Sequence, residues 1–350
     1  MEKDIRTIKS IMIIFVFCLI IYLIFILAEM LIPLALAIFI AILLQPILAW
    51  LDSKKLPFGL SMVLITSITV GIIYLVGALV VGTWNELSKE QDVLLQNINE
   101  RLNSLLGWIN SFTDLRLSAD EFILTIKNLI SADWLIKSTG NFAGALGNFT
   151  TIFFMTILYL VVLLGGILKY EKYISYLEED IDEEGKLLNG FEKVKTSVST
   201  YIKVKFFMSL STGIGYWLVC LIFKVEFALF WGFLAFILNF IPTVGSIIAT
   251  IPPVLLGLIE FESFTTLLVF IPVLFAVQMI FGNVIEPKLM GSRLSLNTIT
   301  VLLGLVFWGY LWGVTGMILS VPLMVLLKVI LEQVNGAEVI VKLMGSKNLS

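Results

Sequence analysis

Long stretches without a charged residue dominate the hydrophobic pattern of this chain. An apolar helix of about 20 residues crosses the hydrocarbon core of a bilayer, which is about 30 Å thick. One uncharged window, residues 206–223, has 18 residues, and seven others have 19 or more: 10–28, 30–51, 56–85, 138–168, 227–259, 263–285 and 294–327. The pattern therefore predicts an all-α polytopic membrane protein with about eight membrane segments.

The polar segments between these windows have helical periodicity. We expect residues 1–83 to hold membrane segments 1–3, with a turn near Glu29 and Pro33, and 149–168 to form the fourth. In 84–148 and 169–205, apolar residues recur at every third or fourth position, which is typical of amphipathic helices. We expect both segments to be amphipathic helices outside the bilayer.

The distribution of basic residues predicts the orientation. Segment 169–205 holds seven Lys and Arg in 37 residues, whereas 84–148 holds five in 65. Cytoplasmic loops carry the excess of basic residues. We therefore expect 169–205, both termini and the tail 336–350 in the cytoplasm, and 84–148 outside. The apolar N-terminal run is not followed by the small-residue cleavage site of a signal peptide, so we expect it to be an uncleaved first span.

The two windows of the last third, 227–259 and 294–327, are too long for one straight span and short for two. Both contain internal glycines and prolines, and five of these are candidate hinges: Pro252, Gly309, Gly313, Gly316 and Pro322. Both windows could cross fully, or both could be re-entrant hairpins, at 227–259 and 299–331. The hairpin arrangement puts Lys288 and Arg293 inside, so the basic residues favour it.

A short internal repeat supports the hairpin interpretation. Residues 230–234 read Phe-Trp-Gly-Phe-Leu, and residues 307–311 read Phe-Trp-Gly-Tyr-Leu. Similar hairpins that enter from opposite sides form an inverted repeat, and such interrupted segments point to a transporter's binding site. Chance recurrence in apolar sequence is the alternative. We take residues 206–335 as the predicted transport core.

Composition excludes several classes of function. The chain is 59% hydrophobic and 14% charged, and it has no histidine and two cysteines. A histidine base, a metal site and a disulfide framework are therefore not expected, and neither is a cofactor. The net charge of −3 and the lack of a basic tract argue against nucleic-acid binding. No Gly-rich phosphate loop is present, so an ATPase is not expected. No nucleophile–base pair supports another enzyme.

Two polar clusters are candidates for binding chemistry. The first lies at the predicted tip of hairpin 227–259, where broken helices free backbone groups that could ligate a small polar solute or a cation. Its residues are Asn239, Pro242, Thr243, Gly245 and Ser246. A tight turn with capping side chains is the structural alternative.

The second cluster follows the window 263–285 and comprises Gln278, Asn283, Glu286, Arg293 and Asn297. A carboxyl group buried in a membrane protein is a candidate proton carrier, and this applies to Glu286. Arg293 or Lys288 could offset its charge or attract an anionic substrate. An interfacial loop whose basic residues set the topology is the alternative.

The motifs of residues 227–330 resemble those of the autoinducer-2 exporter (AI-2E) family. They are Asn-Val-Ile-Glu-Pro-Lys-Leu-Met-Gly at 283–291, Leu-Ser-Leu-Asn at 294–297, Trp-Gly-Tyr-Leu-Trp-Gly-Val-Thr-Gly at 308–316, Val-Pro-Leu at 321–323, and Ile-Pro-Thr-Val-Gly-Ser at 241–246 with Pro252. The resemblance implies a multi-pass transporter of the bacterial inner membrane that forms a homo-oligomer, such as a pentamer. Members are linked to export of autoinducer-2, and some to sodium–proton antiport.

We therefore expect a secondary transporter that exports a small polar metabolite or signal of the autoinducer-2 type by alternating access. In this hypothesis the two hairpins and residues 263–298 move against the N-terminal spans and the 84–148 helices. One alternative is a sodium (or lithium)–proton antiporter, with Glu286 as proton carrier and Asn239, Thr243 and Ser246 as ligands. The other is a structural membrane protein without transport activity.

Overall fold

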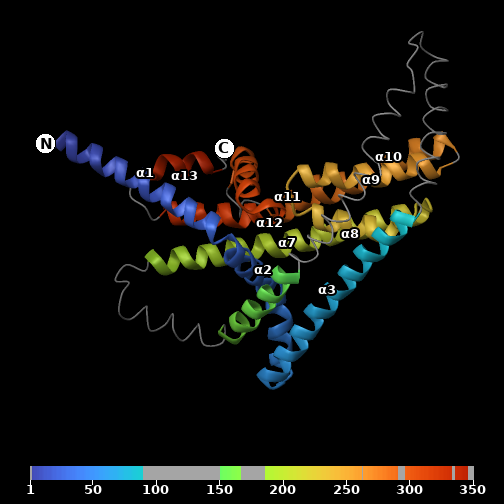
Figure 1. The fold of residues 1–350 in the computed structure, drawn as a ribbon, viewed down its shortest axis with the longest axis horizontal. Coiled ribbons are helices and arrows are strands. Elements are labelled where there is room, and N and C mark those ends of the chain that lie inside the picture. The colour runs from blue at the N-terminus through green and yellow to red at the C-terminus, as the bar shows by residue number, and fades with distance from the viewer. Residues whose placement is uncertain are drawn as a thin grey trace, which may run out of the picture. The chain divides into compact units, whose positions relative to one another are not determined.

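A computed structural model describes residues 2–89, 150–166, 186–261, 263–290, 296–332 and 336–345. Most of the predicted segment 84–148, the first half of 169–205 and Arg293 lie outside these ranges. The described elements are helices: α1 (Glu2–Ile26), α2 (Ala28–Ser53), α3 (Phe58–Lys89), Thr150–Gly166, α7 (Lys186–Ile222), α8 (Ala228–Leu238), α9 (Val244–Glu260), α10 (Phe264–Gln278), the π-helix η1 (Met279–Ile285), α11 (Glu286–Met290), α12 (Thr298–Glu332) and α13 (Glu338–Met344) (Figure 1).

Five helices in the described part of the chain are long and apolar enough to cross a membrane. They are Ala28–Ser53, Gly59–Thr83, Lys195–Ile222, Phe264–Met290 and Thr298–Glu332. Three shorter apolar helices are Thr150–Gly166, α8 and α9. The predicted class, a helical protein with several membrane-spanning segments, is confirmed.

The helices belong to two compact units. One contains Met1–Thr66, Thr151–Val204 and Met290–Ser350, and the other contains Ser67–Thr150 and Lys205–Leu289. In the first unit, α2 packs with the start of α3 and helix Thr150–Gly166 around Ala37, Ile65 and Leu160, each of which is completely buried. Close packing of this kind accounts for most of the stability of such apolar helices.

The second unit is organised around α7, α8, α9 and α10. Its core includes Tyr216, Cys220, Trp231, Phe270 and Leu274. Helices α8 and α10 both contact α9. Gly213 of α7 lies against Gly232 of α8, where an added Cβ would come within 2.7 Å of the Gly232 carbonyl oxygen. Small residues at this crossing let the two helix backbones approach closely.

Each of the two Gly/Pro-interrupted windows folds back on itself. The first forms α8 and α9, which pack together on either side of Asn239–Thr243. The second is α12, where Gly313 has φ 61° and ψ −144°. In a straight helix Gly304 and Met324 would be about 30 Å apart, yet the Met324 side chain lies against Gly304. The backbone at Gly313 therefore reverses the chain direction.

Two features of this grouping concern α7 and α12. Helix α7 is continuous from Lys186 to Ile222 and so runs through residue 205. The folded-back α12 packs through Trp308, Leu311 and Trp312 on residues of α1 and α2. This hairpin therefore shares a compact unit with the N-terminal helices, whereas α8 and α9 belong to the other unit.

Candidate transport site

A stripe of polar side chains lies on the buried face of α7. Lys205, Ser209, Thr212 and Tyr216 follow one another at intervals of four, three and four residues, so they share one side of the helix. All four are at least 96% buried. The stripe extends over about 17 Å of the helix axis. Polar side chains within a membrane helix face the interior of the protein and mark functional pathways.

Asn239 is the centre of an amide network that reaches Ser209 of the stripe. Asn239, the residue after α8, donates from Nδ2 to Ser209 Oγ at 3.1 Å, and Gln278 at the end of α10 donates from Nε2 to Asn239 Oδ1 at 3.3 Å. The network joins three helices of one unit. It also brings together Asn239 and Gln278, which the sequence analysis assigned to two separate clusters.

One turn before Ser209, Lys205 forms an ion pair with Glu286. The distance from Lys205 Nζ to Glu286 Oε1 is 2.6 Å, and the side chains are only 6% and 13% exposed. An unpaired charge at this depth would be strongly unfavourable. Glu286 is therefore paired with a lysine from a distant part of the chain rather than with Lys288, which is exposed.

A π-helix lies between the amide network and the ion pair. Helix η1 begins directly after Gln278 and ends directly before Glu286. Its cause lies in Pro287, which lacks an N–H and whose ring clashes with the carbonyl four residues earlier. The wider turn relieves this clash and rotates Glu286 relative to α10. Single π-helical turns occur frequently at functional sites.

The far end of the stripe contacts the first hairpin. The Tyr216 hydroxyl lies 2.6 Å from Thr250 Oγ1, and Thr250 in turn donates to the Ser246 carbonyl at 2.8 Å. Because the Thr250 proton is directed to Ser246, Tyr216 is the donor of the first bond. These two bonds connect α7 to the early part of α9.

The predicted tip residues make hydrogen bonds and close contacts within the turn. The Ser246 hydroxyl donates to the Thr243 carbonyl at 2.8 Å, and Val244 N–H donates to the Pro242 carbonyl. Thr243 has φ 61° and ψ −55°, a strained backbone for a β-branched residue. Gly245 packs so closely on Leu238 that a Cβ would overlap the Leu238 carbonyl oxygen. Strain of this kind is concentrated at functional sites.

The other predicted residues lie apart from the network. Asn297 caps α12, because its Oδ1 accepts from Thr300 N–H at 2.7 Å, and its Nδ2 donates to carbonyls of Leu343 and Gly345 near α13. Asn283 is exposed, and its Nδ2 lies 3.9 Å from Met279 Sδ. Among the predicted hinges, Gly313 and Gly316 form the reversal of α12, Gly309 lies against Met317, and Pro252 and Pro322 lie inside α9 and α12.

The residues predicted from the sequence did not include Lys205, Ser209 and Tyr216. Lys205 was counted as the last basic residue of a cytoplasmic segment, because the uncharged window begins after it. The available signal was the interval pattern of Lys205, Ser209, Thr212 and Tyr216, which predicts one polar face that continues into an apolar span.

An all-helical architecture with several membrane-spanning helices and a buried polar network defines the class of polytopic membrane proteins. The chain belongs to the AI-2E family of transporters, which it matches over residues 10–336. It is 30% identical over 323 residues to the "AI-2 transport protein TqsA" of Escherichia coli (strain K12), covering 92% of this chain and 91% of that protein. It is also 31% identical over 306 residues to a "Putative transport protein" of Haemophilus influenzae, covering 87% of each. The protein is thus a membrane transporter.

Proposed function

We propose that this protein is a secondary transporter that exports a small polar metabolite or signal of the autoinducer-2 type by alternating access. One observation carries the proposal. The buried residues Lys205, Ser209 and Asn239 lie among helices that are otherwise apolar. Lys205 pairs with the partly buried Glu286, and Asn239 bonds to Ser209 and to the partly buried Gln278. Buried polar groups of this kind in a membrane are costly and are kept for function.

The topology proposed is that of a multi-pass protein of the bacterial inner membrane with about eight segments and both termini in the cytoplasm. The two folded-back windows are proposed to be re-entrant hairpins. In support, α8 has 11 residues and α9 has 17, and both are shorter than the roughly 20 residues that a full crossing requires. Two short helices joined by a tight turn suit a segment that enters and leaves on the same side.

The substrate class follows from the groups in the network. Amide and hydroxyl groups offer several hydrogen bonds of both kinds, which suits a small hydroxylated solute. The Lys205–Glu286 pair leaves the site without net charge, so a neutral solute meets no uncompensated charge. The name of the E. coli relative, an AI-2 transport protein, agrees with such a substrate. Glu286, Asn239 and Gln278 are the proposed binding residues, with Lys205 and Ser209 added from the geometry.

A second candidate function is sodium–proton antiport with Glu286 as the proton carrier. Its support is the Lys205–Glu286 pair, since protonation of Glu286 would leave Lys205 without a partner and would drive a local rearrangement. Among the ligands first considered, the amide oxygen of Asn239 accepts from Gln278 and the hydroxyl of Ser246 donates to Thr243. These bonds would have to change before either side chain could hold a cation.

The test uses full-length protein in proteoliposomes that contain a trapped pH dye. Sodium and autoinducer-2 are added separately, and uptake of autoinducer-2 is compared with that of empty liposomes. Autoinducer-2 uptake without a sodium response supports the exporter. A sodium-driven pH change that is lost in Glu286→Gln establishes the antiporter instead.

The control is Lys288→Met, which changes an exposed charge two residues from Glu286. If this variant and Glu286→Gln transport equally well, Glu286 has no role in transport. If neither ligand produces a response in any variant, a structural membrane protein becomes the better description. Cross-linking of the purified protein tests the proposed homo-oligomer, for which a pentamer is the expected assembly.

A further inference from the structure

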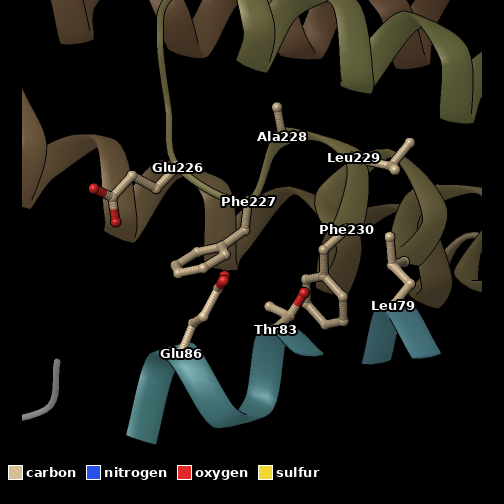
Figure 2. Close-up of a pocket in the computed structure, with 8 residues that line it drawn as sticks. All are labelled: Leu79, Thr83, Glu86, Glu226, Phe227, Ala228, Leu229 and Phe230. Carbon is tan, nitrogen blue, oxygen red and sulfur yellow. The ribbon is translucent and has the colours of Figure 1, made fainter. Parts of the chain in front are cut away.

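An open pocket of about 490 Å³ lies in the second unit, away from the polar network. One side is formed by Leu79, Thr83 and Glu86 near the end of α3, and the other by the turn Glu226–Phe230 that leads into α8 (Figure 2). This volume is within the range of sites for small molecules. None of its lining residues belongs to the network proposed for transport.

The α3 side supplies two polar groups, the Thr83 hydroxyl and the Glu86 carboxylate. Thr83 is buried, and its hydroxyl makes no hydrogen bond to another described residue. Glu86 is exposed and forms no ion pair within the described part of the chain. In Figure 2 the Thr83 hydroxyl and the Glu86 carboxylate are directed across the pocket toward the rings of Phe230 and Phe227, whereas the Glu226 carboxylate points away. A hydroxyl that faces an open pocket and has no partner among the described residues is available to a bound ligand.

The opposite side is held rigidly. Trp231 Nε1 donates to the Glu226 carbonyl at 2.9 Å, and Glu226 N–H donates to Glu260 Oε2 at 3.1 Å. Phe227 adopts the left-handed conformation, with φ 56° and ψ 30°. Phe230 packs edge-on against Trp231, with ring centroids 5.0 Å apart. The two phenyl rings are thus fixed toward the pocket before a ligand binds, which lowers the cost of binding.

We propose that this pocket binds a small organic ammonium ion. The faces of Phe227 and Phe230 and the Glu86 carboxylate all attract a cation, and the Thr83 hydroxyl can accept from an ammonium N–H or contact a polar substituent. A metal ion is the poorer fit, because hard cations take six or more oxygen ligands and the lining is mainly apolar. No group of three or more metal-binding acidic, cysteine or histidine side chains occurs in the described ranges.

The test is calorimetric titration of full-length protein in a neutral detergent. Choline is compared with 3,3-dimethylbutan-1-ol, its isostere in which carbon replaces the charged nitrogen. Choline should bind and the alcohol should not. Glu86→Gln and Phe230→Leu should each lower the choline affinity about tenfold, which corresponds to the loss of about 1.4 kcal/mol from a charge or cation–π contact.

The matched control is Glu338→Gln, which removes an exposed carboxylate of α13 in the other unit. It should bind choline as the unaltered protein does. Equal affinity of Glu86→Gln and Glu338→Gln would overturn the proposal, and so would equal binding of the alcohol or no heat from choline. Transport of autoinducer-2 or sodium is measured separately, so this site and the transport proposal can fail independently.

Discussion

The two folded-back windows use the same backbone device in different surroundings. In α8–α9, Gly245 packs on the Leu238 carbonyl, and in α12, Gly316 packs on the Trp308 carbonyl. The reversal of the first window begins at Asn239, which is hydrogen-bonded to α7 and α10, whereas the second window places Trp308 and Trp312 against α1 and α2. The glycine contact therefore specifies the reversal, and the neighbouring side chains decide whether it faces a polar network or an apolar contact.

The largest effect is expected at the ion pair beside the first window. Lys205→Met leaves Glu286 buried without a partner, which should cost about 3–5 kcal/mol of unfolding free energy. The double variant Lys205→Met/Glu286→Gln should recover much of this stability, because no unpaired charge remains. Denaturant unfolding in detergent measures both. Lys288→Met, at an exposed site, is the control, and a Lys205→Met protein as stable as this control would contradict the prediction.

The next effect tests whether the two reversals are equivalent. Gly245→Ala and Gly316→Ala each place a Cβ where it overlaps a carbonyl oxygen. Since backbone must move to relieve the overlap, each change should cost up to about 3 kcal/mol. Thermal unfolding of the purified variants measures this.

Gly71→Ala is the matched control for both. It lies inside α3 with nothing within 4 Å of the added Cβ. Alanine is the better helix former by about 1 kcal/mol, so this variant should be as stable as the unaltered protein or more stable. If Gly245→Ala behaved like Gly71→Ala while Gly316→Ala did not, the two reversals would not share one device.

A smaller effect separates the polar window from the apolar one. Asn239→Ala leaves the Ser209 hydroxyl and the Gln278 amide without their partner in a buried site, which should cost about 1–3 kcal/mol. Autoinducer-2 or sodium flux should also fall. The control Asn283→Ala removes the same side chain from an exposed position, so unfolding should change by less than about 0.5 kcal/mol. If Asn239→Ala and Asn283→Ala lost equal amounts of unfolding free energy, the hydrogen bonds of Asn239 would contribute no stability.

The backbone reversals could be predicted from the sequence, whereas their surroundings could be predicted only in part. Both windows are too long for one span and short for two, and both contain internal Gly and Pro, so both were expected to break. The structure places the reversals at Asn239–Thr243 and Gly313. Asn239, Gln278 and Glu286 were predicted as candidates because polar residues stand out beside apolar runs. Lys205 was not, because the uncharged window begins after it. Its pairing over 81 positions depends on tertiary packing, which no local pattern encodes.

The smallest effect concerns two tryptophans of the apolar window with similar burial. Trp312 Nε1 donates to the Ile24 carbonyl at 3.2 Å, while the buried Trp308 Nε1 has no hydrogen-bond partner among the residues that the structure describes. Replacement by Phe removes a similar volume at both sites, but it removes a hydrogen bond only at Trp312. Trp312→Phe should therefore be less stable than Trp308→Phe by about 1 kcal/mol, measured by denaturant unfolding. Neither change should alter flux, because both residues pack on α1 and α2 rather than on the polar network. A selective loss of flux in either variant would mean that the apolar window contributes to transport as directly as the polar one.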